Sequence, residues 1–261
     1  MYHRGLRALV AAILALTGTV QVRGTAPAIA ACARPFTLYD NTHYSDRPLA
    51  PYAVTRSGVF YEDAAERESI AAGHVPDKRA FIDAVAAEVQ APGPLVLDFE
   101  DLYLTGTPAI ATFHLRVLTL LASWAHQAAP RMVIGFYGLL GHTATAYLPL
   151  ARRLAPLEDA FFPSLYTFDD DHALWEGRLQ GDMQQAQAID PRKPVYPYIW
   201  PQYHEHTPRA LQYLDAAYWS FQLRSIHALA NGAVIWSGGG PNGSAAWVVS
   251  TAQFLRTSAS C

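Results

Sequence analysis

The stretch Leu95-Val96-Leu97-Asp98-Phe99-Glu100 is a short apolar run that contains two acidic residues at its end. Its length and composition predict a buried strand, and residues 108–127 carry apolar side chains at the three- and four-residue spacing of a helix. Strands that alternate with helices in this way form a parallel sheet. The alternation continues along the chain, with predicted strands at 36–40, 58–62, 95–100, 132–137, 161–166, 195–199 and 233–236 and predicted helices at 77–90, 108–127, 144–154, 172–189, 209–231 and 243–257.

Two parallel folds fit this order, a doubly wound open sheet and a (β/α) barrel. A nucleotide-binding open sheet has a glycine-rich turn directly after its first strand, whereas this chain has Asn41-Thr42-His43 there. The sequence therefore predicts an α/β fold of the TIM-like (β/α)-barrel type, with seven strands in a single domain. In such barrels the chemistry lies where the strands end, at their carboxyl face.

Composition limits the classes of partner. The chain of 261 residues is 51% hydrophobic and 16% charged, which is enough apolar material for one large core. Its formal net charge is −3, and it has no long run of Lys or Arg. Surfaces that bind nucleic acid are basic, so we expect no nucleic-acid partner.

The first thirty residues have the pattern of an export signal. Basic residues precede an apolar run at 8–16, and small residues follow up to Ala30. This order predicts a signal peptide at 1–30, a mature domain at 31–261 and a secreted or periplasmic protein. The run is too short to cross a bilayer, and we expect no stable membrane span. Ile29-Ala30-Ala31-Cys32 also fits the pattern that precedes a lipid-modified bacterial cysteine, so a lipid anchor at Cys32 is the alternative.

Cys32 and Cys261, the two cysteines of the sequence, lie at opposite ends of the mature domain. The start of the first strand and the end of the last helix of a barrel lie at the same face, so these residues can reach the Cα separation of about 4.4–6.8 Å that a disulfide needs. We therefore expect a Cys32–Cys261 disulfide in the exported protein. Intact-mass measurement with alkylation checks this: two thiols alkylated without reductant, or a lipid on Cys32, contradict it.

Asp98 and Glu100 are the sharpest chemical signal. Strand alternation sends both to one face while Phe99 points away. Two carboxylates this close do not both ionise readily, so one proton is retained near neutral pH, as a general acid requires. An ordinary solvated acidic pair at a strand end is the alternative interpretation.

Aromatic residues occur near the ends of four more predicted strands. A pyranose has apolar C–H faces and hydroxyl edges, so Trp provides a floor and Tyr provides a wall with a hydrogen-bond donor. Core packing is the alternative for any single ring, but their convergence favours a carbohydrate site. The segments are Gly135-Phe136-Tyr137-Gly138, Pro163-Ser164-Leu165-Tyr166, Tyr196-Pro197-Tyr198-Ile199-Trp200 and Val234-Ile235-Trp236.

The motifs between Arg34 and Gly238 resemble, in order, those of the animal and venom hyaluronidases. This resemblance implies a seven-stranded barrel and a glycoside hydrolase, namely an endo-β-N-acetylhexosaminidase. It rests on the segments RPFTLYDNTH (34–43), VFY (59–61), VLDFE (96–100), GFYG (135–138), PSLY (163–166), VYPY (195–198) and GAVIW (232–236).

The resemblance also implies roles for single residues. Glu100 would protonate the leaving glycosidic oxygen while the substrate's own 2-acetamido oxygen attacks the anomeric carbon, so that configuration is retained. Asp98 would orient the acetamide nitrogen and share the proton, Tyr166 would hydrogen-bond the acetamide, and Trp236 would lie beneath it.

Further substrate-binding residues are expected among the tyrosines. Tyr137 is one, and a second is either Tyr198 or Tyr203, between which the sequence does not decide. His204-Glu205-His206 lacks a spacing that would by itself impose metal ligation. We therefore expect no metal and no cofactor.

Two departures from the family pattern bear on the substrate. Phe99 stands where the family has tryptophan, and residues 101–106 replace a tryptophan-rich basic segment. Few basic residues near the groove weaken the case for a polyanion such as hyaluronan. The expected partner is therefore a polysaccharide that contains N-acetylhexosamine. The alternatives are a glycosidase of another polysaccharide specificity on the same barrel and a non-catalytic carbohydrate-binding protein.

Overall fold

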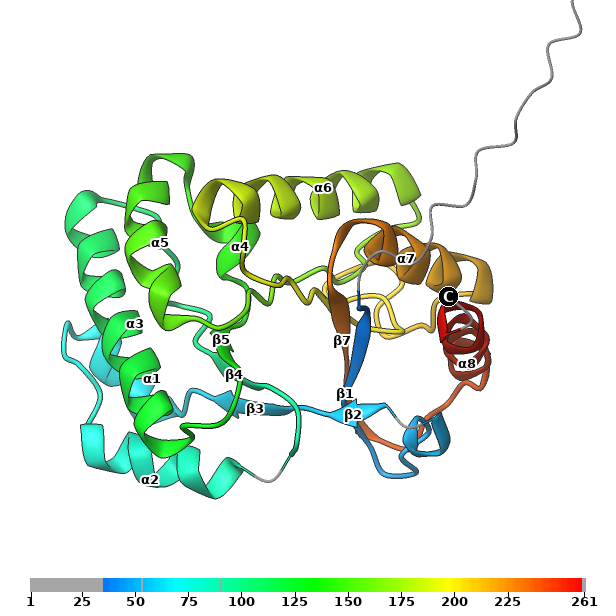
Figure 1. Ribbon diagram of the computed structural model, residues 1–261, viewed down its shortest axis with the longest axis horizontal. Helices are drawn as coiled ribbons and strands as arrows, with labels where there is room; N and C mark the ends of the chain where they lie inside the picture. Colours follow the sequence, from blue (N-terminus) through cyan, green and yellow to red (C-terminus); the bar gives the residue numbers. More distant parts are fainter. Residues whose placement is uncertain (1–34, 53, 90, 260–261) are drawn as a thin grey trace, which may run out of the picture. The chain divides into compact units, whose positions relative to one another are not determined.

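Parallel strands lie between the helices in the computed structural model, which describes residues 35–52, 54–89 and 91–259 (Figure 1). The strands form two ladders, in the orders β2-β1-β7-β6 and β3-β4-β5. Their bounds are β1 (Thr37–Tyr44), β2 (Thr55–Arg56), β3 (Gly58–Tyr61), β4 (Leu95–Asp98), β5 (Ile134–Phe136), β6 (Tyr198–Ile199) and β7 (Gly232–Gly240).

The two ladders are joined on both sides. Ser57 alone separates β2 from β3, so the segment 55–61 pairs with β1 at one end and with β4 at the other. On the opposite side, isolated parallel bridges place residues 161–164 between β5 and β6. The parallel pairings of the described residues thus pass through seven strand segments and return to β1. The predicted (β/α)-barrel fold class is confirmed.

The segment predicted as a strand at 161–166 forms isolated bridges rather than a continuous ladder. Pro163 lies within it. Its partner segment, 195–199, contains Pro197 and is directly preceded by Pro194. Proline has no backbone N–H, so each one removes a donor that a ladder would use. The predicted strand at 195–199 shortens for the same reason to the two residues of β6.

Helices follow the strands and cover them from outside. In Figure 1, α2 and α3 lie beside β3–β5 and α7 lies beside β7, with α8 packed against α7. Their bounds are α1 (Ala64–Ala71), α2 (Lys78–Glu88), α3 (Pro108–Ala128), α4 (Leu139–His142), α5 (Leu148–Leu154), α6 (His172–Ile189), α7 (Ala216–Leu229) and α8 (Ala246–Ala259), with short 3-10 turns at Ala50–Tyr52, Thr145–Tyr147 and Ala155–Leu157.

Side-chain caps set the starts of the helices. Asp63 and Glu66 form a capping box that begins α1, a short helix that was not expected from the sequence. The helix predicted at 209–231 begins later, because the Asp215 carboxylate accepts from the Tyr218 N–H and caps α7. The residues just before it form an antiparallel bridge between Gln202 and Tyr213 instead.

Alternation along β4 separates two cores. Leu95 and Leu97 pack with Phe99 in an outer cluster against the helices. Phe99 is 2% exposed, and burying such a side chain contributes roughly 1.5–3 kcal/mol. Val96 points the other way, into an inner cluster, so Asp98, two residues further on, also points inward. The inner cluster consists of Val96, Tyr137, Ala160, Phe162, Tyr166, Tyr198, Trp200 and Val234.

The predictions for the chain ends fall outside the described residues. The predicted signal peptide at 1–30, Cys32 and Cys261 all lie in segments that the structure does not describe. The signal peptide, the disulfide and the alternative lipid anchor therefore stay predictions. No helix within 35–52, 54–89 or 91–259 is long and apolar enough to cross a membrane.

Candidate active site

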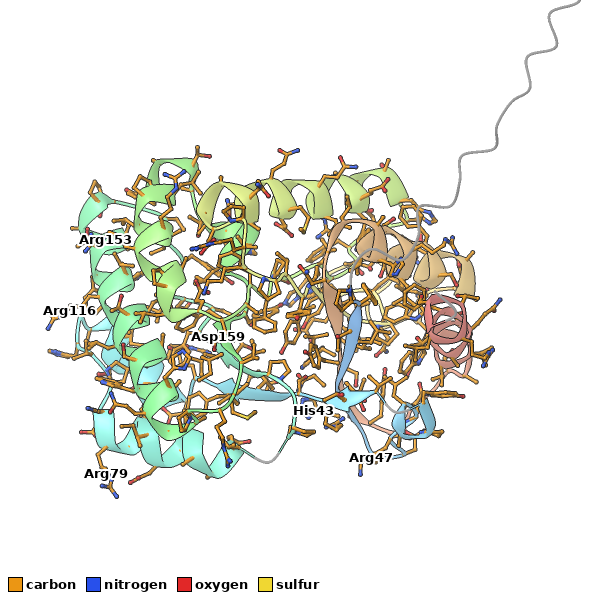
Figure 2. The ribbon with its side chains drawn as sticks, in the orientation of Figure 1. His43, Arg47, Arg79, Arg116, Arg153 and Asp159 are labelled. Carbon is orange, nitrogen blue, oxygen red and sulfur yellow. The ribbon has the colours of Figure 1, made fainter. Side chains whose placement is uncertain are left out.

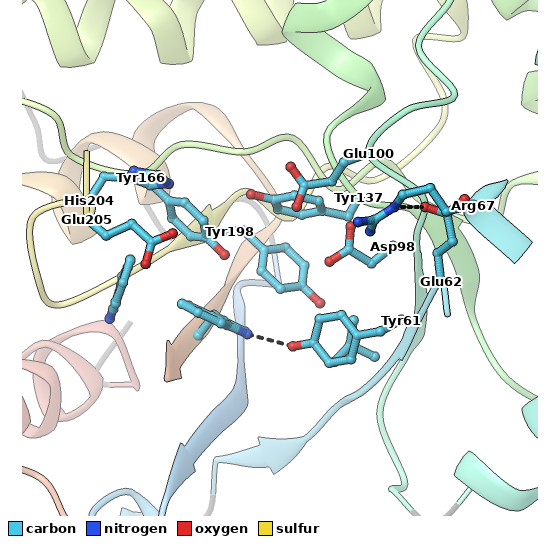
Figure 3. A pocket seen from close by; sticks show the side chains of 13 residues that line it. Tyr61, Glu62, Arg67, Asp98, Glu100, Tyr137, Tyr166, Tyr198, His204 and Glu205 are labelled. Carbon is cyan, nitrogen blue, oxygen red and sulfur yellow. Dashed lines mark hydrogen bonds and ion pairs between the residues drawn. The ribbon is translucent and has the colours of Figure 1, made fainter. Parts of the chain in front are cut away.

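A cavity of about 220 Å³ opens where the strands end at their carboxyl face (Figure 3). Its acids, tyrosines and tryptophans come from β3, β4, β6 and β7 and from the segments that follow the strands. Its lining residues are Val59, Tyr61, Glu62, Arg67, Asp98, Glu100, Tyr137, Tyr166, Tyr198, Trp200, His204, Glu205 and Trp236.

The cavity brings Asp98 and Glu100 together. Both line it, whereas Phe99 between them contacts Phe60 and Phe81 on the helix side, with ring centroids 6.1 and 6.3 Å away. Glu100 is exposed at the mouth. Burial, with Glu100 and then Glu62 nearby, raises the pKa of Asp98 to about 7. Among the described residues, the Asp98 Oδ1 atom is buried without a hydrogen-bond partner. It is therefore free to bind a polar group of a ligand.

Glu62 and Arg67 flank the acidic pair. The Glu62 N–H donates to the Asp98 carbonyl, which fixes the end of β3 beside the end of β4. Burial raises the pKa of Glu62, while Arg67 opposes the shift from 3.0 Å away. Arg67 also lies 3.6 Å from Asp101. Neither Glu62 nor Arg67 was predicted as a site residue from the sequence. Glu62 directly follows β3, however, just as Asp98 and Glu100 stand at and after the end of β4.

Three rings pack around one side of the cavity. Trp200 and Trp236 meet edge to face with centroids 4.8 Å apart, and Tyr166 lies 5.7 Å from each. The Trp236 indole N–H donates to the Tyr61 hydroxyl at 2.9 Å (Figure 3). These contacts hold the rings in place before a ligand binds. A sugar would therefore not have to immobilise these side chains on binding.

The tyrosines differ in what their hydroxyls contact. Tyr137 donates to the Ser164 hydroxyl at 2.8 Å. Tyr198 is 1% exposed and lines the cavity, and its hydroxyl has no hydrogen-bond partner among the described residues. An unpartnered buried hydroxyl is costly unless a ligand or water satisfies it. Tyr198 is thus positioned to bind a ligand.

Of the two alternatives for the second tyrosine, Tyr203 does not line the cavity. It is buried in the loop after β6, where its hydroxyl donates to Asp170 and accepts from Arg209 at 2.8 Å. The Arg209 guanidinium also lies over its ring, 4.2 Å from the centroid. These contacts hold Tyr203 away from the acids, and Tyr198 is the tyrosine that faces them.

A second cavity of about 510 Å³ continues from the first. The two share Glu100, Tyr137, Tyr166 and His204, so Glu100 lies where they meet. A chain of sugars could therefore extend past Glu100 on both sides. The second cavity is also lined by Tyr103, Leu140, Gly141, His142, Ser164, Phe168, Arg178, Gly181, Asp182 and Gln185.

Two charged groups from α6, Arg178 and Asp182, line the second cavity together with Glu100. The Arg178 guanidinium donates to the Tyr166 carbonyl at 2.8 Å and lies 5.1 Å from the Phe168 ring centroid. Burial raises the pKa of Asp182 to about 7, and Arg178 opposes that shift. Within the described part of the chain, no group of three His, Cys, Asp or Glu side chains could hold a metal ion.

Comparison with known proteins identifies the fold. No protein-family model matches the sequence, and no curated protein matches it. Among solved structures, bee venom hyaluronidase matches with a TM-score of 0.56 and 15% identity, covering 85% of this chain and 97% of that chain. The fold is similar to that of a hyaluronidase. The complex of bee venom hyaluronidase with a hyaluronic acid tetramer matches with a TM-score of 0.58 and 16% identity, covering 85% of this chain and 95% of that chain.

The assignment of a hyaluronidase-like barrel fold is therefore based on a structural match over nearly the whole length of those enzymes, not on sequence identity. A DUF72 family protein from Enterococcus faecalis also matches, with a TM-score of 0.38 and 10% identity over 87% of this chain and 98% of that chain. At 15–16% identity the likeness to the hyaluronidase structures establishes the fold alone, and the chemistry has to be argued from the cavity.

The free energy of unfolding is expected to fall as the pH rises from about 4 to about 7. The folded protein holds a proton on Asp98 up to about pH 7, whereas the unfolded chain releases it near the ordinary aspartate pKa of 3.8. The folded state therefore gains stability from the bound proton. The gain is complete below about pH 4 and is lost as the pH passes 7, a change on the order of 2–4 kcal/mol in the free energy of unfolding. Urea unfolding at pH 4.5 and pH 7.5 measures the summed change, to which Asp182 contributes in the same direction.

Asp98→Asn should show a smaller difference between the two pH values than the wild type, because the amide does not titrate. Glu88→Gln, an exposed change on α2, is the control and should keep the wild-type difference. An equal pH dependence in wild type and Asp98→Asn would assign the proton to another group.

Proposed function

We propose that the protein is an exported endo-β-N-acetylhexosaminidase that hydrolyses a polysaccharide by substrate-assisted catalysis with retention of configuration. The observation that carries the proposal is the pair Asp98 and Glu100, which faces a cavity bounded by fixed tyrosine and tryptophan rings. The hyaluronidase-like barrel supports it, because hyaluronidase-type chemistry uses the carboxyl end of this fold. The pattern at residues 1–30 supports export.

The acidic pair has the properties that leaving-group protonation needs. The raised pKa of Asp98 keeps a proton beside Glu100 near neutral pH. Glu100 is the exposed member and lies where the two cavities meet. In the proposal, the glycosidic oxygen lies at that junction and Glu100 delivers the proton to it as the bond breaks.

The substrate supplies the nucleophile in this mechanism. The oxygen of its 2-acetamido group attacks the anomeric carbon and forms a cyclic oxazolinium ion, and Glu100 then removes a proton from the water that opens the ring. Asp98 Oδ1 lacks a partner and would accept the acetamide N–H. Tyr166 and Tyr198 would donate to the acetamide, and Trp236 would lie beneath the sugar.

Product analysis tests the proposal. The purified exported protein is incubated with hyaluronan, chondroitin and chitin oligosaccharides, and the products are identified by mass spectrometry and proton NMR. We expect internal cleavage of at least one polymer, with a new reducing-end N-acetylhexosamine that first appears as the β-anomer. An α-anomer as first product would indicate inversion. Binding without cleavage of any of them would favour a carbohydrate-binding protein.

A further inference from the structure

The charges of the first cavity are strongly unequal. Four carboxyl groups line it, and Arg67 is the one lysine or arginine among its described lining residues. Arg67 is already matched, since its Nε atom lies 3.0 Å from Glu62 and 3.6 Å from Asp101. The four carboxyl residues are Glu62, Asp98, Glu100 and Glu205. Since Glu62 is paired with Arg67 and burial raises the pKa of Asp98, Glu100 and Glu205 are the carboxyl groups that would oppose a negatively charged sugar ring here.

Glu205 differs from the other three carboxyl groups, which interact with Arg67, because its basic partner is a histidine. It lies across the cavity from Asp98 and Arg67 (Figure 3), with a side chain that is 59% exposed. Its nearest basic partner is His206 at 3.6 Å, which is charged only when protonated. Burial lowers the pKa of His204, so that ring is neutral near pH 7. A fixed negative charge thus remains at the rim of the cavity.

Distant arginines do not offset this charge. Arg79, Arg116 and Arg153 lie on the outer helices α2, α3 and α5, where they are exposed (Figure 2). Exposed charges separated by more than about 8 Å are largely screened at physiological salt. Arg178 in the second cavity is accompanied by Asp182, so that cavity has no large excess of positive charge.

The cavity also has features that suit a polar ligand. Tyr198 is nine-tenths or more buried, and its unpartnered hydroxyl belongs to the lining. The rings of Trp200 and Trp236 line the same cavity. An aromatic surface with a free hydroxyl suits a sugar ring, whereas an acidic cluster alone would equally suit a metal ion.

We propose that the substrate is a partially deacetylated polymer of N-acetylhexosamine, and that Glu205 pairs with the ammonium group of a sugar next to the acetylated one. The proposal rests on the hexosaminidase function above and names its substrate class. An acetylated sugar occupies the first cavity, where its acetamido group is needed, and a neighbouring glucosamine-type residue brings a positive charge to the rim. A uronic acid at that neighbouring position would instead oppose Glu205.

Three oligosaccharides of equal length separate the charge classes: fully acetylated chitin hexamer, partially deacetylated chitin hexamer and hyaluronan hexasaccharide. We expect kcat/KM to be highest for the partially deacetylated probe and lowest for hyaluronan, and the advantage of the cationic probe to shrink as salt is raised from 20 to 500 mM. Hyaluronan cleaved as well as or better than acetylated chitin would overturn the proposal and leave the hexosaminidase function standing.

Substitutions at Glu205 test its role directly. Glu205→Gln should reduce the ratio of kcat/KM for the cationic probe to that for the neutral probe by about three- to tenfold. Glu205→Lys should reverse the order of the cationic and anionic probes. Glu88→Gln removes the same charge from the exposed face of α2 and should keep the wild-type ratio. An unchanged ratio in Glu205→Gln contradicts the proposed pairing.

Isothermal titration calorimetry with the same probes measures their affinities. It tests the preference for a cationic sugar separately from the hexosaminidase function. If none of the probes is cleaved, the hexosaminidase function fails, whereas the charge preference is still measured by the order of affinities. Tighter binding of the cationic probe than of hyaluronan supports the preference. The reverse order overturns it.

Discussion

Glu100→Gln is expected to lower kcat by roughly two to four orders of magnitude, the range that general acid catalysis contributes. Glutamine keeps the size of the side chain but has no proton to transfer to the leaving oxygen. Glu100 is exposed at the junction of the two cavities, so the change should leave the core and the melting temperature nearly unaltered. The measurement is kcat on whichever N-acetylhexosamine oligosaccharide the wild type cleaves, together with a thermal melt.

Two further variants make this result specific. Asp98→Asn should also reduce kcat, because it removes the partner that holds the shared proton. Glu88→Gln, on the exposed face of α2, changes the net charge equally and should retain wild-type kcat. If Glu100→Gln retained activity within a factor of about three, Glu100 would not be the acid and Glu205 would be the next carboxylate to test.

The directions of the side chains along β4 could be predicted from the sequence because alternation has a fixed period. Once residues 95–100 are taken as a strand, Asp98 shares the inward side with Val96, and Phe99 must pack against the helices, as the structure shows. Local periodicity is enough for these positions. The strand predicted at 233–236 extends further, to Gly240, so Trp236 lies in the middle of β7 rather than at its end, although it does line the cavity.

Residues brought in by loops and short helices could not be predicted in this way. Arg67 lies on α1, an eight-residue helix with a weak apolar pattern, whose start depends on the capping contacts of Asp63. Tyr198 and Tyr203 are both aromatic residues near the end of β6, and the contacts of Tyr203 with Asp170 and Arg209 decide between them. Such contacts join distant parts of the chain and leave no local pattern.

Charge balance is likewise a property of the folded chain. The sequence shows few basic residues near the predicted groove, but it does not show that Arg67 is already paired or that Glu205 faces the acidic pair. The sequence argued only weakly against a polyanionic substrate. The structure adds that Glu205 lines the cavity, which leads to a specific expectation about that residue. The chemistry of the acidic pair and the choice of substrate therefore rest on different residues and are tested by different variants.

Removal of the 2-acetamido group from the sugar at the cleavage point is expected to abolish hydrolysis. The proposed mechanism takes its nucleophile from the substrate, so a β-linked hexose oligosaccharide with a 2-hydroxyl in that position offers no oxygen that can close on the anomeric carbon. Asp98 Oδ1 and the Tyr198 hydroxyl, both unpartnered, would also lose the group they are proposed to bind.

The test compares acetylated chitin oligosaccharides with cellulose oligosaccharides of the same length and linkage, which differ at the 2-position. Cleavage of the acetylated series alone is the expected result, with a cyclic thiazoline analogue of the oxazolinium ion as a competitive inhibitor. Cleavage of both series at similar rates, or isolation of a glycosyl ester on Glu100 or Glu205, would assign the nucleophile to the protein. In that case the pair of carboxylates across the cavity, rather than the acetamide, would carry the reaction.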